Sequence, residues 1–181
     1  MIPLLISIAI ALGAALFLFR LVRGNVRERH IQSLDDLNGR TLPVDVGAFQ
    51  NLISRSEDAY LRSAVSLRDY RRLRRLRTYA TIEYLSRVAH NAAVLLRLGE
   101  AARESESNDV ADAGRELVNT AIAVRLSVML TIVRLYLSLL WPAGNAFCAK
   151  AMARYATLKS VFETLGGLQN PAFTTHLARG L

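Results

Sequence analysis

The chain has 181 residues with one cysteine, four prolines, two lysines and few aromatic residues, and each scarcity narrows the class of protein. The single Cys148 excludes an internal disulfide and any cysteine-based zinc site. The low proline content leaves room for long helices. Because 52% of the residues are hydrophobic but only 7% are aromatic, the apolar mass is mainly Leu, Ala, Val and Ile, which favours helical packing over a sheet core.

Charged side chains are absent from residues 1–19, MIPLLISIAIALGAALFLF. At about 1.5 Å per residue a helix of this length spans roughly 28 Å, close to the ~30 Å hydrocarbon core of a bilayer. Arginines stand at positions 20, 23, 27 and 29, whereas no basic side chain precedes the apolar run. The positive-inside rule therefore predicts a single-pass membrane protein with its amino terminus outside and its C-terminal domain in the cytoplasm. A cleaved signal peptide is the competing interpretation, but its basic region would stand before the apolar run.

The segments after the apolar run predict an all-α protein. Residues 20–44 are polar and contain the turn dipeptide Asn38-Gly39, so we expect a basic juxtamembrane connector. Asp45 is a candidate N-cap, and the absence of proline after it favours one long helical stretch from Val46 to about Glu104. We expect an exposed apolar stripe on the first part of this stretch, suited to a partner or to self-association, with the members Phe49, Ile53, Tyr60, Ala64 and Leu67.

Two further helices complete the predicted antiparallel bundle of long helices. Polar residues near position 106 indicate a turn, after which Asn108 or Asp109 caps a very apolar helix that runs to Trp141. The last helix ends at Gly166-Gly167. Short turns make neighbouring helices antiparallel, so a turn centred at 106 to 107 places residue 88 opposite residue 125. The predicted organisation is a transmembrane anchor at 1–19, a connector at 20–44, a helical bundle at 45–166 and a C-terminal tail at 167–181.

An arginine run occupies residues 67–77, LRDYRRLRRLR. On a helix, four of its arginines share a face of about 100°, namely Arg68, Arg71, Arg72 and Arg75. The four side chains repel one another, so the alternatives are a solvated face, contact with anionic lipid headgroups, or contact with an acidic patch on a partner or second copy. Nucleic acid is the weakest alternative because only Tyr70 and Tyr79 supply stacking aromatics and no binding motif is present.

The apolar helix contains two arginines, Arg125 and Arg134, that need an explanation. If the helix is buried in the bundle, these charges require partners, and we predict buried ion pairs of Arg125 with Glu163 and of Arg134 with Glu83, or with a backbone carbonyl. The alternative is a second span over residues 117–141, with both arginines on a buried polar path. Each arginine then costs about 2.5 to 3.5 kcal/mol, and the basic C-terminal part would lie outside, against the charge rule.

Residues that carry chemistry are sparse. His30, His90 and His176 lack the spacing of metal ligands. Glu83, Arg87 and His90 share a helical face, but a surface salt bridge is the commoner meaning of this arrangement. We therefore predict no catalytic, cofactor-binding or metal site. The sequence favours a non-enzymatic interaction, scaffold or assembly module held at the cytoplasmic membrane face, with lipid and a protein partner or second copy as contacts. The alternative is a small multi-span membrane subunit.

Overall fold

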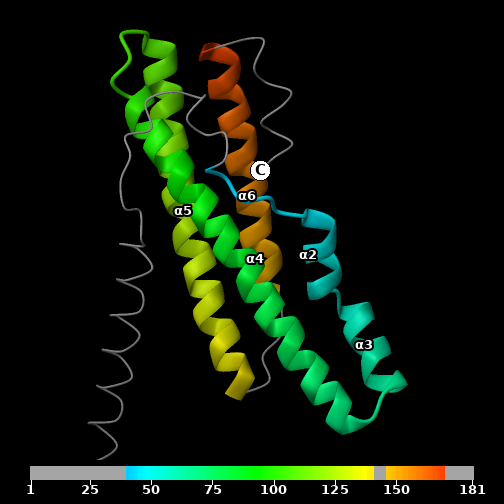
Figure 1. The fold of residues 1–181 in the computed structure, drawn as a ribbon. Helices are drawn as coiled ribbons and strands as arrows, with labels where there is room; N and C mark the ends of the chain where they lie inside the picture. Colours follow the sequence, from blue (N-terminus) through cyan, green and yellow to red (C-terminus); the bar gives the residue numbers. More distant parts are fainter. Residues whose placement is uncertain (1–39, 141–145, 170–181) are drawn as a thin grey trace, which may run out of the picture.

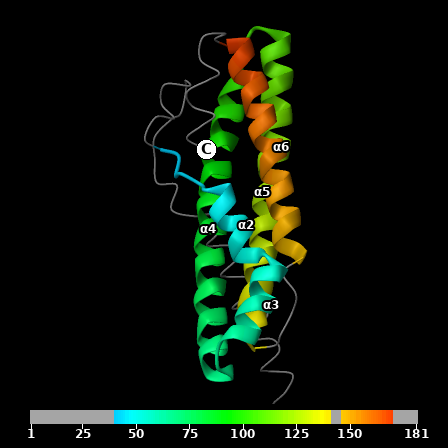
Figure 2. The ribbon, with the colours of Figure 1, turned by 90° about the vertical axis from the view of Figure 1, so that its right-hand side faces the viewer.

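The computed structural model describes residues 40–140 and 146–169, and these residues form an all-α fold without strands. Five helices pack together in the described ranges, and Figures 1 and 2 show the three longest running side by side with two short ones along the lower half of α4. The predicted anchor at residues 1–19 and Trp141 lie outside the described residues. The helices are α2 (Val46–Ile53), α3 (Arg55–Ala64), α4 (Leu67–Ala102), α5 (Asn108–Leu140) and α6 (Ala146–Gln169).

Helix α2 begins at the predicted N-cap. The side chain of Asp45 accepts a hydrogen bond from the Ala48 amide at 2.9 Å, which satisfies one of the donors that a helix start leaves unpaired. The predicted single helix from Val46 to about Glu104 is wrong, however, because α2 ends at Ile53 and a new helix follows at once.

Two serines divide the predicted long helix into three. Ser54 adopts an extended backbone and accepts a hydrogen bond from the Glu57 amide, so it caps α3. Ser66 does the same for α4, accepting from the Asp69 amide at 3.2 Å while its hydroxyl donates to the Asp69 carboxylate at 2.7 Å. A serine three residues before an acidic residue is a capping pattern, so the sequence carried a signal for both breaks.

Helices α4 and α5 form an antiparallel hairpin with the predicted register. A turn centred at 106 to 107 requires Gly99 to lie opposite Gly114, and the two glycines do face each other. The backbones approach closely here, because a Cβ added at Gly114 would lie 2.9 Å from Ala102 Cβ. Helix α5 starts at Asn108, so the predicted cap at Asn108 or Asp109 is displaced and the residue before the helix is Ser107, whose carbonyl oxygen accepts from the Ala111 amide at 2.9 Å. Helix α6 continues beyond the predicted end at Gly166 and ends at Gln169.

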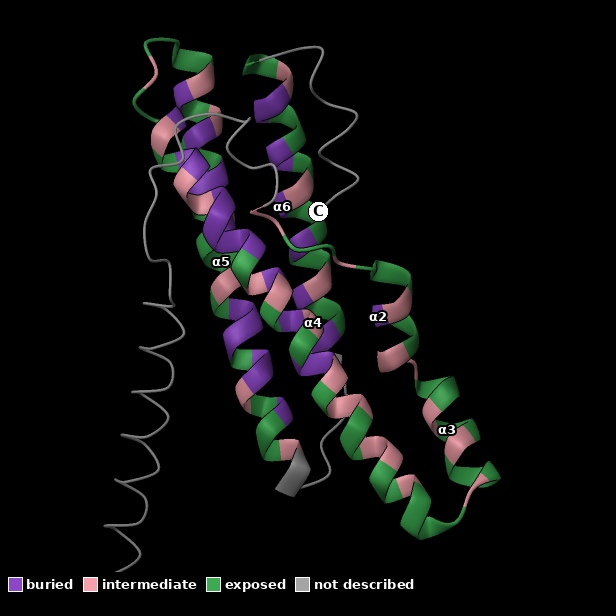
Figure 3. Cartoon of the chain, viewed as in Figure 1, coloured by how far each residue is buried: buried purple, intermediate pink, exposed green. Residues whose placement is uncertain are grey.

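The hydrophobic core runs between the three long helices. Helix α5 packs against both α4 and α6, which meet each other only slightly. Figure 3 shows the buried residues concentrated along these three helices, whereas α3 and the first turns of α4 are exposed or half-buried.

The apolar stripe predicted on the first helical stretch does not remain intact. Phe49 is fully buried and packs edge-on against the Tyr84 ring, with ring centroids 6.0 Å apart, so the prediction that it is exposed is wrong. Tyr60 and Leu67 are exposed as predicted. The predicted stripe is divided because the breaks at Ser54 and Ser66 place its members on three separate helices, which do not share one continuous face.

Candidate functional site

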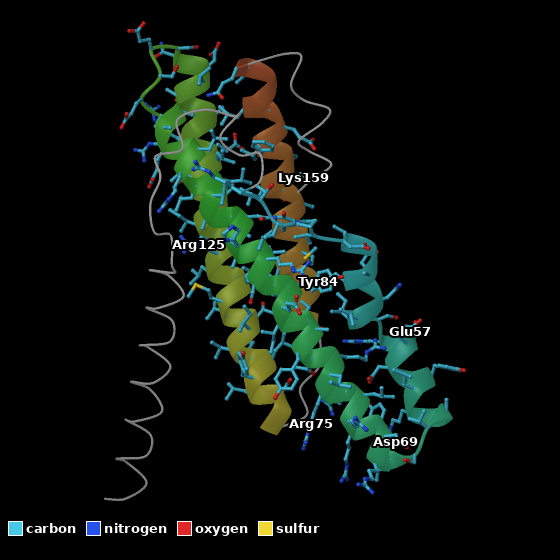
Figure 4. The ribbon with its side chains drawn as sticks, in the orientation of Figure 1. Glu57, Asp69, Arg75, Tyr84, Arg125 and Lys159 are labelled. Carbon is cyan, nitrogen blue, oxygen red and sulfur yellow. The ribbon has the colours of Figure 1, made fainter. Side chains whose placement is uncertain are left out.

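The first turns of α4 present positive charge interspersed with apolar side chains. Arg68, Arg72 and Arg75 are exposed, and Leu76 and Tyr79 are exposed by 56% and 54%. At 3.6 residues per turn these five residues lie within an arc of about 100°, and we call them the basic face. Figure 4 shows Arg75 near the end of the bundle where α3 leads into α4. Basic residues beside aromatic and aliphatic ones are typical of a helix that lies at a membrane interface.

The arginine run divides as the helical spacing predicts. Arg68, Arg71, Arg72 and Arg75, for which the sequence predicts contact with lipid or a partner, are all exposed. Arg74 and Arg77 on the opposite side are only partly exposed. In the described ranges no ion pair neutralises any of the four exposed arginines, and contact with lipid or a partner stays a prediction.

A cleft of about 250 Å³ lies between the α2–α3 junction, α4 and the end of α5. We call it the arginine cleft, because Arg55, Arg74 and Arg77 line it beside a single lining carboxylate, Asp58. Arg77 is fixed there because its Nη2 donates to the carbonyl oxygen of Asn51 at 2.8 Å and to that of Leu52 at 3.0 Å. The sequence analysis did not find this site, because it forms only where α2 and α3 fold back along α4.

A second feature that the sequence did not reveal is a polar clamp at Asn91. Residues 40–44, which we call the strap, cross α4 at the level of this fully buried side chain. Asn91 Oδ1 accepts from the Leu42 amide at 2.8 Å, and its Nδ2 donates to the Leu42 carbonyl at 2.8 Å and to the Tyr155 hydroxyl at 3.0 Å. His90 Nε2 donates to the Arg40 carbonyl oxygen at 2.9 Å. One buried amide therefore joins the strap, α4 and α6.

Helix α5 leaves one apolar face uncovered within the described residues. We define the α5 stripe as Ile122, Leu126, Leu130, Val133 and Leu137, of which the four besides Val133 are between 47% and 57% exposed. Among the described helices, α5 is the one that is long and apolar enough to cross a membrane, with a mean hydropathy of 1.7 in its most apolar stretch. Only 39% of that stretch is buried in the bundle, so the helix is not enclosed as a core helix normally is.

The predicted ion pairs of the apolar helix do not have the buried setting that the sequence suggested. Arg134, Glu83 and Glu163 are exposed, and only Arg125 is partly buried. Glu83 accepts a hydrogen bond from Arg87 Nη2 at 2.6 Å. The prediction that these ion pairs are buried is therefore wrong, because part of α5 lies at the surface of the bundle. The pairings Arg125–Glu163 and Arg134–Glu83 stay a prediction.

The partly buried arginine of α5 lies close to a second one. Burial lowers the pKa of Arg125 below its ordinary value, and the guanidinium of Arg97 on α4 lowers it further. Arg97 lies on α4 and Arg125 on α5, so the two like charges come from neighbouring helices of the hairpin. Arg97 and Arg125 both make further interactions within the protein.

Reactive groups are few in the part of the chain that the structure describes. No group of three or more His, Cys, Asp or Glu side chains in that part is placed to hold a metal ion. Cys148 is buried, and burial raises the pKa of its thiol to about 11, which keeps the thiol protonated at neutral pH. Glu83 and Arg87 form the salt bridge that the sequence suggested.

Comparisons with known proteins give no relative for this arrangement, because no family model, no curated protein and no solved structure matches the chain.

Proposed function

We propose that the chain is a single-pass membrane-anchored helical protein that acts without catalysis, as an interaction, scaffold or assembly module at the cytoplasmic membrane face. The basic face is the observation that carries this proposal, because it combines exposed arginines with exposed Leu76 and Tyr79 at one end of the bundle. The uncharged residues 1–19 supply the anchor. A tethered protein loses little further freedom when it lays a basic face on anionic lipid, and each arginine near that surface contributes about 1 kcal/mol.

A protein partner or second copy of the chain is the other contact in this proposal. The sequence assigned that role to the stripe from Phe49 to Leu67, but Phe49 belongs to the core. The α5 stripe replaces it as the candidate surface, since its large aliphatic side chains remain about half exposed. Contiguous apolar patches that are exposed to solvent commonly mark interaction sites.

A small multi-span subunit with residues 117–141 inserted is the second candidate, and the length and apolar composition of α5 favour it. The packing of the bundle opposes it. With Gly99 opposite Gly114, the exposed Glu83 and His90 of α4 lie level with about residues 130 and 123 of α5. A spanning α5 that kept its packing would carry these groups into hydrocarbon, where an ionised side chain costs about 2.5 to 3.5 kcal/mol.

Binding to anionic vesicles tests the basic face. The chain without residues 1–19 is used, because the anchor would hold the protein on the membrane whatever the arginines do. In one variant, which we call the basic-face variant, glutamine replaces the three arginines of the basic face and the neighbouring exposed arginine of the same run, which are Arg68, Arg72, Arg75 and Arg71. In the control variant glutamine replaces four exposed basic residues elsewhere, Arg103, Arg115, Lys150 and Arg154. Cosedimentation with vesicles across a salt series measures both variants and the unsubstituted chain.

We expect the basic-face variant to bind more than tenfold more weakly at low salt and to show a flatter salt dependence, because up to four surface contacts of about 1 kcal/mol each are lost. The control variant should keep most of its binding. Equal weakening of the two variants would show that total charge alone decides binding, and the basic face would then have no special role.

Cysteine labelling separates the two candidates. Cys148 is buried and serves poorly as a reporter, so single cysteines are placed at the exposed Ala59 of α3 and Ala156 of α6, which precede and follow α5. The Cys148→Ala background removes residual labelling. A reagent that does not cross membranes should reach neither position in intact cells under the single-pass proposal. Labelling of one position from outside, but not of the other, would establish a second crossing.

A further inference from the structure

The arginine cleft has more positive charge than it neutralises. Three guanidiniums line it, from Arg55, Arg74 and Arg77, against one lining carboxylate, Asp58. That carboxylate is engaged by the Tyr70 hydroxyl, which donates to it at 3.0 Å. The lining itself therefore carries a surplus of two positive charges, part of which is offset by the Glu57 carboxylate, 3.9 Å from Arg77 and outside the lining.

The three guanidiniums differ in how they are held. Arg77 donates to the two carbonyl oxygens at the end of α2 and lies 3.9 Å from the Glu57 carboxylate, so its position is set by the fold. No hydrogen bond or ion pair joins the side chains of Arg55 or Arg74 to another described residue. The guanidinium N–H groups of Arg55 and Arg74 are therefore available to a ligand beside the fixed guanidinium of Arg77.

The local backbone and the volume fit the same class of ligand. The first turn of α3 starts at the edge of the cleft with Ser54 and Arg55, so the partial positive charge of the helix start adds to that of the arginines. The hydroxyls of Thr78, Thr81 and Ser138 donate to carbonyl oxygens of their own helices, and the Ser54 hydroxyl pairs with that of Ser56. The arginines are therefore the main side-chain donors of the lining. The cleft volume of about 250 Å³ has room for a chemical group the size of several water molecules, each of which occupies about 30 Å³ in the liquid.

We propose that the arginine cleft binds a phosphate monoester, with Arg55 and Arg74 as donors to the phosphate oxygens and Arg77 as the fixed charge behind them. A phosphate monoester carries a charge of about −1.5 to −2 at neutral pH and presents three terminal oxygens, so it can accept hydrogen bonds from both Arg55 and Arg74, whereas a carboxylate presents two oxygens and a single charge. Planar guanidinium forks pair with phosphate oxygens two at a time. This site goes beyond the membrane-contact function, because Arg74 does not belong to the basic face.

The ligand has two possible sources, a soluble phosphate monoester and a lipid headgroup that ends in a phosphate monoester. Purified full chain in detergent micelles is titrated with inorganic phosphate by calorimetry at constant ionic strength. The full chain with glutamine in place of Arg68, Arg71, Arg72 and Arg75 lacks the general attraction of these arginines for anionic lipid. This variant is titrated with bilayer nanodiscs that contain either phosphatidic acid, a monoester, or phosphatidylglycerol, a diester. Saturation by inorganic phosphate as tight as by phosphatidic acid assigns the site to a soluble ligand. Saturation by phosphatidic acid alone assigns it to a lipid.

Arg74→Gln and Arg62→Gln form a matched pair, because both remove one positive charge from the part of the chain that forms α3 and the start of α4, but only Arg74 lines the cleft. Arg62 is exposed on α3 and does not belong to the basic face. Arg74→Gln should weaken monoester binding at least tenfold, and Arg62→Gln less than twofold. Arg74→Lys should recover part of the loss, because it keeps the charge but not the fork. Arg77→Gln is avoided, because it also releases the end of α2.

Three results would overturn the proposal. They are equal weakening by the two glutamine variants, binding of phosphatidylglycerol as tight as that of phosphatidic acid, and no saturable binding of either inorganic phosphate or phosphatidic acid. Far-UV circular dichroism checks that Arg74→Gln keeps its helices. Arg55→Gln, at an exposed position on the first turn of α3, provides a second variant with the same expected tenfold loss. Loss of vesicle binding through the basic face leaves this test unaffected in micelles.

Discussion

Replacing Asn91 by alanine tests whether one buried amide holds the strap on the bundle. The substitution removes three hydrogen bonds, two with the backbone of Leu42 and one with the Tyr155 hydroxyl. Each contributes about 1 kcal/mol net, so the loss is about 3 kcal/mol. Alanine favours the helix over asparagine by about 0.6 kcal/mol, which leaves an expected net destabilisation of roughly 2 to 3 kcal/mol.

Urea unfolding followed by far-UV circular dichroism measures this change, and a loss of that size corresponds to a Tm lower by about 4 to 12 °C. Asn119→Ala is the matched control, because Asn119 is exposed on α5 and the same exchange there changes mainly helix propensity. Hydrogen exchange gives a local readout, since the Leu42 amide donates to Asn91 and should lose its protection in Asn91→Ala.

The reasoning about the clamp would be refuted by a specific pair of results. These are a free energy of unfolding for Asn91→Ala within about 0.5 kcal/mol of that for Asn119→Ala, a margin typical of surface substitutions, and unchanged protection of the Leu42 amide. Loss of protection without loss of global stability would show that the strap opens locally while the three long helices stay packed.

Two further predictions concern packing and pH. Gly114→Ala should lower the free energy of unfolding by about 1 to 3 kcal/mol, because its Cβ would lie 2.9 Å from the facing turn, whereas Gly166→Ala, with nothing within 4 Å, should be neutral or stabilising in the same urea titration. Burial raises the pKa of Cys148 from 9.0 to about 11. The stability that this thiol contributes is therefore complete below pH 9 and is lost as the pH rises to 11, by about 2 to 3 kcal/mol. From pH 8 to pH 10 the free energy of unfolding should fall in the unsubstituted protein and change much less in Cys148→Ala, and an equal dependence on pH in the two proteins would contradict the prediction. Above pH 10 the buried Tyr155, whose pKa is also raised by burial, adds a loss of its own.

The arrangement of the long helices was predictable because local signals set it. Asp45 has the side chain that an N-cap needs, and the polar residues near position 106 leave only a short turn between two apolar helices. A short turn forces antiparallel packing, so the pairing of Gly99 with Gly114 follows from counting residues. Ser54 and Ser66 were equally local signals, but the prediction relied on the absence of proline and did not use them.

The sequence by itself determined where helices form and which way they run, because caps, turns and apolar spacing act over a few residues. Tertiary structure alone decided which faces are covered. Helix α5 is apolar on nearly every side, so its periodicity does not indicate that Leu126 stays exposed while Val128 is buried. The polar clamp at Asn91 and the cleft at Arg74 likewise depend on segments distant in the chain, since the strap brings Leu42 to Asn91 and helices α2 and α3 fold back to close the cleft.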